Sequence, residues 1–157
     1  MLNTTMNTQD SVSANFAECF VTRNGTRYAM LMAKNFEGKA SVNTKEVYRL
    51  GSVTVGHKAQ TVVLKFSMTI YKCTEIFDDV IEEFIRTGVM PLFTIQVSNE
   101  DPATAIGRST KIYHDCVLDG DVLLSMANAE GGYIEQSIEG YCDSITRPER
   151  YTNPSYM

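Results

Sequence analysis

The sequence is poor in the residues that build metal and catalytic sites. Its 157 residues include only four cysteines and two histidines. None of the cysteines forms a CxxC pair, and the histidines do not cluster beside them; the four are Cys19, Cys73, Cys116 and Cys142. This spacing indicates neither a zinc site nor a disulfide framework, so we expect reduced thiols in a cytosolic protein that carries no metal and no cofactor.

Positive charge and long apolar runs are also scarce. Lysine and arginine number 14 against 19 acidic residues, which gives a net charge of -5. Such a balance disfavours a surface that grips nucleic acid by neutralising phosphates, although a surface that repels DNA agrees with it. No apolar run reaches the length of a membrane span and the first 16 residues lack a signal-peptide pattern, so we expect neither membrane insertion nor secretion.

What the chain does contain is a series of β-strand patterns. Asn24 and Gly25 form the dipeptide most typical of a two-residue hairpin turn. Between residues 62 and 71 apolar and polar side chains alternate with a period of two, which predicts a strand buried on one face. The other predicted strands are 19–23, 26–32, 34–42, 47–50, 92–98, 109–118, 121–127 and 133–145.

One segment, "TEIFDDVIEEFIRTG", has the period of an amphipathic helix. We predict a helix over residues 74–87, with Thr74 as its N-cap and Gly88 as its stop. Its apolar face comprises Ile76, Phe77, Val80, Ile81, Phe84 and Ile85. Its opposite, exposed face comprises the carboxylates Asp78, Asp79, Glu82 and Glu83.

The acidic helix face has three interpretations. Carboxylates at i and i+4 have a spacing that could hold a cation, but no second ligand cluster accompanies them. A solvated face is what amphipathic helices normally show, and we favour it. A contact face for a partner protein lies between these two.

These elements predict one domain, residues 1–157, of mainly β structure. We expect an antiparallel β-sandwich or small barrel of seven or eight strands, with the helix covering its open end. Residues 1–15 are polar and are predicted to form a flexible arm, and residues 147–157 a loose tail.

The stretch "GSVTVGHKAQT" at residues 51–61 has the outline of a phosphate-binding loop. A true phosphate loop needs Gly-Lys-Ser/Thr in succession and a following helix. Here His57 separates Gly56 from Lys58, and a strand pattern follows. We therefore predict a loop between strands, hinged at Gly51 and Gly56. His57 and His114 have no nucleophile or carboxylate arranged with them, so no enzyme is indicated.

The last predicted strand carries an acidic alternation at Glu135, Glu139 and Asp143. Half-exposed antiparallel strands commonly show such a polar face. An alternative is a negative surface that lets DNA pass without sticking.

The order of these features, from about Ser41 to Tyr151, resembles the tail-tube proteins of contractile phages, defective prophages and R-type bacteriocins of Gram-positive bacteria. The resemblance is carried by "EVYRLGSVTVGHK", "KFSMTIYKCTEIFDDVIEEFIRTGVMPLFTIQV", "GRSTKIYHDCVLDG" and the late "IEG" and "RPERY" segments. Gly56-His57-Lys58 is its most specific element.

The resemblance implies a non-enzymatic structural subunit. Its expected partners are copies of itself in stacked hexameric rings, a sheath protein, and baseplate and tail-terminator proteins, within a virion or bacteriocin particle assembled in the bacterial cytoplasm. DNA would pass through the lumen, which we expect Glu135 and Glu139 to line. The loop with Gly51, Gly56, His57 and Lys58, together with residues 1–15, would contact neighbouring subunits. The competing classes are a monomeric adaptor that docks through its helix and, on the imperfect glycine loop alone, an NTP-hydrolysing enzyme.

Overall fold

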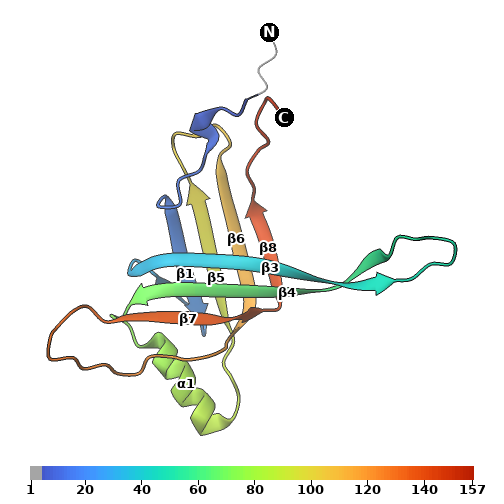
Figure 1. Cartoon of the computed structure of the whole chain (residues 1–157). Helices are drawn as coiled ribbons and strands as arrows, with labels where there is room; N and C mark the ends of the chain where they lie inside the picture. Colours follow the sequence, from blue (N-terminus) through green and yellow to red (C-terminus); the bar gives the residue numbers. More distant parts are fainter. Residues whose placement is uncertain (1–4) are drawn as a thin grey trace.

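The computed structural model describes residues 5–157, which form mainly β-strands and one α-helix (Figure 1). Pairing is antiparallel throughout, in the order β2-β1-β5-β6-β7-β4-β3, with β8 beside β6. The predicted antiparallel fold of seven or eight strands and one α-helix is confirmed, with eight strands in the described chain. The elements are a 3-10 helix (Thr8–Asp10), β1 (Ala17–Arg23), β2 (Thr26–Ala29), β3 (Ala33–Val47), β4 (Gly56–Tyr71), α1 (Ile76–Thr87), β5 (Phe93–Glu100), β6 (Arg108–Leu118), β7 (Glu135–Cys142) and β8 (Ser144–Glu149).

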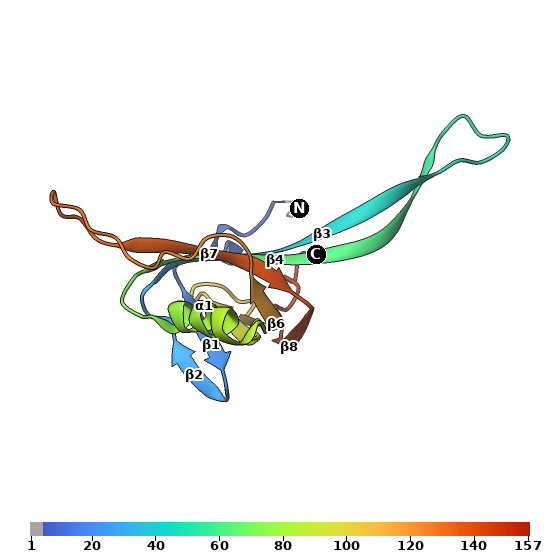
Figure 2. The ribbon, with the colours of Figure 1, turned by 90° about the horizontal axis from the view of Figure 1, so that it is seen from below.

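The strands form two layers that cross one another. β3, β4 and β7 make one layer, and β1, β2, β5, β8 and most of β6 make the other (Figures 1 and 2). Strand β6 joins the layers, since His114 pairs with Ser144 of β8 whereas Val117 pairs with Tyr141 of β7. Asp115, between these two pairings, has φ +52°, so the strand turns a corner there.

The two layers and α1 enclose one apolar core. Aromatic rings form a chain through this core, in the order Tyr113, Phe36, Phe66, Phe93 and Phe77. The centroids of successive rings are 5.5 to 6.5 Å apart. Phe77 comes from α1, so this chain ties the helix to both layers. The other large side chains that are fully buried are Met68, Ile70, Ile95, Ile138, Val21, Val80 and Cys116.

Two glycines allow close packing within the body. A Cβ atom on Gly140 would lie 1.9 Å from the Val117 carbonyl oxygen. A Cβ atom on Gly38 would lie 2.2 Å from the Tyr113 hydroxyl. Only a residue without a side chain fits these positions unless the neighbouring groups move.

The predicted turn and helix end are confirmed. Asn24 and Gly25 both have positive φ, at 52° and 77°, as a two-residue hairpin requires. Gly88 ends α1 in the left-handed conformation and donates its amide to the Phe84 carbonyl at 2.8 Å. The predicted N-cap Thr74 is wrong, because the first helical hydrogen bond runs from Asp79 N–H to the Glu75 carbonyl, which makes Glu75 the cap.

Strand β3 is continuous where the sequence predicted two strands, 34–42 and 47–50. It pairs with β4 from Ala33 opposite Ile70 to Val47 opposite Gly56. Cross-strand hydrogen bonds thus hold residues 43–46 in the ladder although their side chains are polar or charged. Only residues 48–55 remain as the turn.

The predicted strand 121–127 is also wrong. Residues 119–134 form an extended loop between β6 and β7, and Leu124 and Met126 are about half exposed. Alternating apolar and polar residues form a strand only where another strand is free to pair with them. Both edges of β4 are already occupied, by β3 and β7. The expected loose tail begins later than predicted, because residues 147–149 belong to β8 and Glu149 pairs with Thr110 of β6.

Candidate assembly surface

The paired ends of β3 and β4 project far beyond the body of the molecule (Figures 1 and 2). We call residues 42–62 the hairpin arm. Every residue of the arm except Gly56 is exposed, although the two strands stay paired to Val47 and Gly56. Two-stranded hairpins in water are marginally stable without a surface to pack against. The arm therefore has the architecture of an element that another surface supports.

The exposed side chains of the arm are unusually apolar. Leu50 and Val53, at the turn, are 105% and 103% exposed. The other large apolar side chains exposed on the arm are Val42, Val47, Tyr48, Val55 and Val62. Exposed apolar side chains gathered on one projecting element are typical of a protein contact site.

The residues predicted to form a contact loop all lie in the arm. Gly51 lies in the turn with φ +78°, a left-handed conformation that glycine adopts without steric cost. Gly56 is not a hinge, because it starts β4 and pairs with Val47. His57 and Lys58 follow it in the strand, so they are held by the ladder rather than by a loop.

A bulge lies near the base of the arm. Asn43 pairs with Thr61, whereas Thr44 pairs with Ala59, so Gln60 is an extra residue on β4. Bulges of this kind increase the local twist of a ladder. The arm consequently leaves the plane of the sheet that it extends.

The sandwich is open between β2 and β3, the two ends of the strand order, so it is not a closed barrel. A cavity of about 810 Å³ lies on this side, with Met30, Leu31, Phe36, Tyr113 and Tyr151 among its lining residues. Within residues 5–157, β3 pairs on one edge only, with β4. A long unpaired edge offers backbone hydrogen-bonding groups to another strand.

Strand β7 also has a partly free edge. All of Glu135–Cys142 pairs with β4 on one side, but on the other side β6 pairs only with Tyr141 and Gly140. In the part of the chain that the structure describes, no strand covers this edge of residues 135–138. The β3-β4-β7 layer therefore has unpaired backbone at both of its borders.

The predicted acidic residues Glu135 and Glu139 lie on the exposed face of the β3-β4-β7 layer. The exposure of β7 alternates strictly, with Gln136 and Ile138 buried between them. Lys34 binds the Glu135 carboxylate at 3.0 Å, and this hydrogen bond raises the pKa of the lysine. Acidic and basic side chains thus alternate on this face, so the face is not uniformly negative.

A second ion pair on the same face joins Lys39 to Glu37 at 3.3 Å. Glu37, Lys39, Lys65, Glu139 and nearby Asp119 border one shallow depression. The neutral polar residues Asn35, Ser67, Thr69 and Ser137 occupy positions beside them in the paired strands. The face is therefore hydrophilic and close to balanced in charge.

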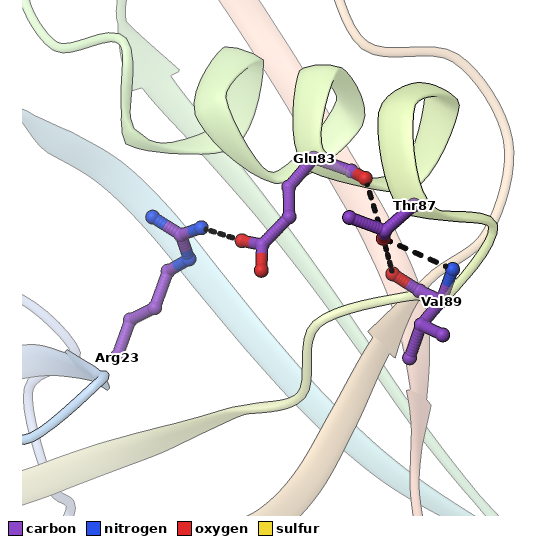
Figure 3. A network of polar contacts seen from close by, with 4 residues as sticks. All are labelled: Arg23, Glu83, Thr87 and Val89. Atoms are coloured by element: carbon purple, nitrogen blue, oxygen red, sulfur yellow. Dashed lines mark hydrogen bonds and ion pairs between the residues drawn. The ribbon is translucent and has the colours of Figure 1, made fainter.

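The four helix carboxylates do not form a single exposed face. Asp79 and Glu82 are exposed as predicted, but Asp78 binds Lys72 at 2.9 Å and Glu83 binds Arg23 at 2.5 Å (Figure 3). The sequence pattern missed these pairs because their bases come from β1 and from the segment after β4.

The end of α1 exposes apolar side chains that the sequence placed in the core. Phe84 is 41% exposed and Ile85 is 78% exposed. Beyond the helix, Val89 and Leu92 are also exposed. The Thr87 hydroxyl donates to the Glu83 carbonyl and accepts from the Val89 amide, which fixes this end of the helix (Figure 3). The period predicted which face is apolar, but the body is too small to cover its last turn.

No group of three or more metal-ligating side chains occurs among residues 5–157. His114 lies in β6 with its Nε2 atom 2.7 Å from the Thr146 hydroxyl, and His57 lies in the hairpin arm. None of the helices in the described chain has the length and apolar character needed to cross a membrane. The strand predicted to follow the glycine-bearing segment is confirmed, so this segment has no helix N-terminus to offer a phosphate.

Comparisons with known proteins agree with this architecture. Phage-like element PBSX protein XkdM of Bacillus subtilis (strain 168) is 23% identical over 124 residues, which is 79% of this chain and 84% of XkdM. Protein YqbM of the same strain, described as uncharacterized, is 23% identical over 121 residues, covering 77% of this chain and 82% of YqbM.

Solved structures show the same fold. A chain of the anti-feeding prophage tube-terminating cap superposes with a TM-score of 0.66 at 13% identity, covering 93% of this chain and 96% of that chain. A chain of the sheath–tube complex of the PVC extracellular contractile injection system, in its extended state, gives 0.61 at 14% identity, covering 85% and 88%.

A family model described as "Phage tail tube protein" matches residues 4–143, which is most of the chain and includes the hairpin arm, α1 and β7. The resemblance found in the sequence is thereby confirmed, and the chain is a structural protein that belongs to the phage tail-tube family.

Proposed function

We propose that this chain is the subunit of a contractile tail tube, in which six copies form a ring and rings stack into a hollow tube. The observation that carries the proposal is the hairpin arm, which is paired and apolar but uncovered. In a tube the arm would lie on neighbouring subunits, so that Leu50 and Val53 leave water. Gly51, Gly56, His57 and Lys58 are its proposed contact residues.

Ring closure is proposed to use the free edges of the β3-β4-β7 layer. The edge of β3 in one subunit would pair with the uncovered half of β7 in the next. Such a head-to-tail contact makes a ring when its rotation closes. Closure would join six three-stranded layers into one continuous barrel and remove the unpaired edges.

The exposed face of this layer is proposed to line the lumen. Glu135 and Glu37 hold Lys34 and Lys39 in ion pairs, so these bases are less available to phosphates. Glu139 adds negative charge beside them. A hydrophilic face without excess positive charge would let DNA slide without adhering.

The remaining partners are proposed from the same assembly. A sheath protein would surround the tube, and baseplate and tail-terminator proteins would meet its ends. Asp79 and Glu82 of α1, which are exposed in the subunit, are proposed to stay exposed in the particle. The particle, a virion or a bacteriocin, would assemble in the bacterial cytoplasm.

Residues 1–15 are proposed to contact an adjacent subunit. Of these, residues 5–15 are described and are mostly exposed, and Ser13 N–H donates to Asp101 Oδ2 at 2.9 Å. Residues 1–4 lie outside the described residues. Deleting residues 1–15 should lower tube yield, and an unchanged yield and tube length would remove this role.

Electron microscopy of the concentrated protein, with and without baseplate complexes as templates, tests the proposal. Rings or hollow fibres are expected in at least one condition. A chain that stays monomeric in both would favour the adaptor that docks through its helix. In a density map of the tube, Glu135 and Glu139 should face the channel, and a map with both side chains facing outward would refute the lumen assignment.

A further inference from the structure

Two of the four cysteines lie against each other in the core, where β6 turns from one layer to the other. The Sγ atoms of Cys116 and Cys142 are 3.1 Å apart. Cys116 is 0% exposed and Cys142 is 8% exposed. Local spacing could not reveal this pair, because the two residues belong to different strands separated by the loop 119–134.

The backbone holds these cysteines in a geometry suited to a cross-link. Val117 pairs with Tyr141 and Leu118 with Gly140, so the same antiparallel register sets Cys116 opposite Cys142. Opposed residues of antiparallel strands have Cα atoms about 4.5 to 5.5 Å apart, within the range that a disulfide spans. The sulfurs need to approach by about 1 Å to reach the length of an S–S bond, about 2.05 Å.

We propose that Cys116 and Cys142 form an intrachain disulfide when the protein meets an oxidising environment, which locks the corner between the two layers. The corner is weakly joined without it, since the β6–β7 ladder contains two residue pairs. The cross-link acts within one subunit, and it stands whether or not the chain forms a tube.

The reaction is a thiol–disulfide exchange with a small disulfide as oxidant. The Cys142 thiolate attacks one sulfur of the oxidant and releases the first thiolate. Cys116 then loses its proton and attacks the Cys142 sulfur, which releases the second. Two electrons and two protons pass from the cysteines to the oxidant, which leaves as two thiols.

The surroundings make Cys142 the attacking residue. The hydrogen bond between the two sulfurs lowers the pKa of Cys142 and, together with burial, raises the pKa of Cys116. Cys142 is also the more exposed of the two. Burial raises the pKa of Cys19 to about 12, so Cys19 is a poor competitor.

Oxidised 2-mercaptoethanol is a suitable probe, followed by alkylation in denaturant and mass spectrometry. The Cys73→Ser protein, which lacks the exposed cysteine, serves as the background. After reduction it should take three alkyl groups. After oxidation it should take one, on Cys19, with a linked peptide that joins residues 116 and 142. Its urea midpoint should rise on oxidation and return after dithiothreitol.

In the same background, Cys142→Ala should keep both remaining thiols alkylatable and show no oxidant-dependent change in the urea midpoint. Cys19→Ala is the matched control: it should take two alkyl groups after reduction and none after oxidation, with the same linked peptide and the same rise in urea midpoint as its parent. Three alkyl groups after oxidation of the Cys73→Ser protein, or a link that involves Cys19, would overturn the proposal. A cross-linked form that unfolds at lower urea would also overturn it. These measurements are made on a protein that keeps both Cys116 and Cys142, so they do not depend on whether a core variant folds.

Discussion

The body and the hairpin arm use the same ladder of β3 and β4 in opposite ways. Within the body, Phe66, Met68 and Ile70 of β4 are buried against the other layer and α1. Along the arm the two strands continue with apolar side chains, and nothing in residues 5–157 covers them. The difference teaches that the ladder alone does not decide stability. The body buries its apolar side chains within the subunit, and we propose that a contact with neighbouring subunits covers those of the arm.

Charge at the arm turn gives the largest expected effect. In the Leu50→Glu/Val53→Glu protein, tubes should be lost while the subunit folds normally, because both side chains are exposed in the subunit and would be buried in the tube. Burying an unpaired carboxylate costs several kcal/mol, and about 1.4 kcal/mol already weakens association tenfold. Pelleting and microscopy measure tubes, and urea unfolding measures the fold.

The control places a single carboxylate elsewhere on the surface. Tyr28→Glu, on the exposed strand β2, should leave tubes intact if the arm is the specific contact. Normal tube yield from the doubly charged arm would contradict the account.

Shortening an apolar side chain should affect the stability of the body but not that of the arm. Ile138→Ala, which removes a side chain that is 0% exposed, should lower the free energy of unfolding by about 2 to 5 kcal/mol. Leu50→Ala, at a fully exposed position, should change it by no more than about 0.5 kcal/mol. Equal losses in urea unfolding would mean that the arm belongs to the cooperative core.

Glycine-to-alanine changes sharpen the comparison further. Gly140→Ala should destabilise the subunit by about 1 to 3 kcal/mol, because the new Cβ atom would lie 1.9 Å from the Val117 carbonyl oxygen. Gly56→Ala should be nearly neutral, since the nearest atom there is 3.6 Å from the new Cβ. A destabilised Gly56→Ala protein would show that the start of β4 is more confined than the arm geometry implies.

The smallest expected effect concerns ion pairs. Glu83→Gln should cost roughly 1 kcal/mol, because Arg23 of the body is partly buried and loses its partner. Glu37→Gln, in an exposed pair with Lys39, should cost nearly nothing. Comparing both in 0.1 and 1 M salt, which screens exposed pairs more strongly, tests the distinction; equal losses at both positions would contradict it.

The sequence predicted the elements whose signals are local. The Asn24-Gly25 hairpin, the alternating strand before Tyr71 and the helix stop at Gly88 are all confirmed, because each depends on a turn residue or a short period. Residues 43–46 were missed as strand because cross-strand pairing, not their composition, keeps them extended. Residues 121–127 failed for the converse reason, since their alternation finds no neighbouring strand.

The sequence predicted which residues make up the candidate site better than it predicted their local structure. Gly51, His57 and Lys58 do lie together in the arm, but their support is a ladder rather than a glycine-hinged loop. The alternation of Glu135 and Glu139 gave their exposed face correctly. Lys34, the partner of Glu135, and Arg23, the partner of Glu83, come from distant strands, so local spacing could not reveal these pairs. Lys72, the partner of Asp78, lies six residues away but outside the helix, so the helical period did not reveal that pair either.

Hydrogen–deuterium exchange, compared between free subunits and assembled tubes, tests the central claim most directly. The account predicts fast exchange of arm amides 42–62 in the free subunit and strong protection in the tube, with little change for β5 in the body. Equal exchange of the arm in both states would contradict the claim that neighbouring subunits complete it.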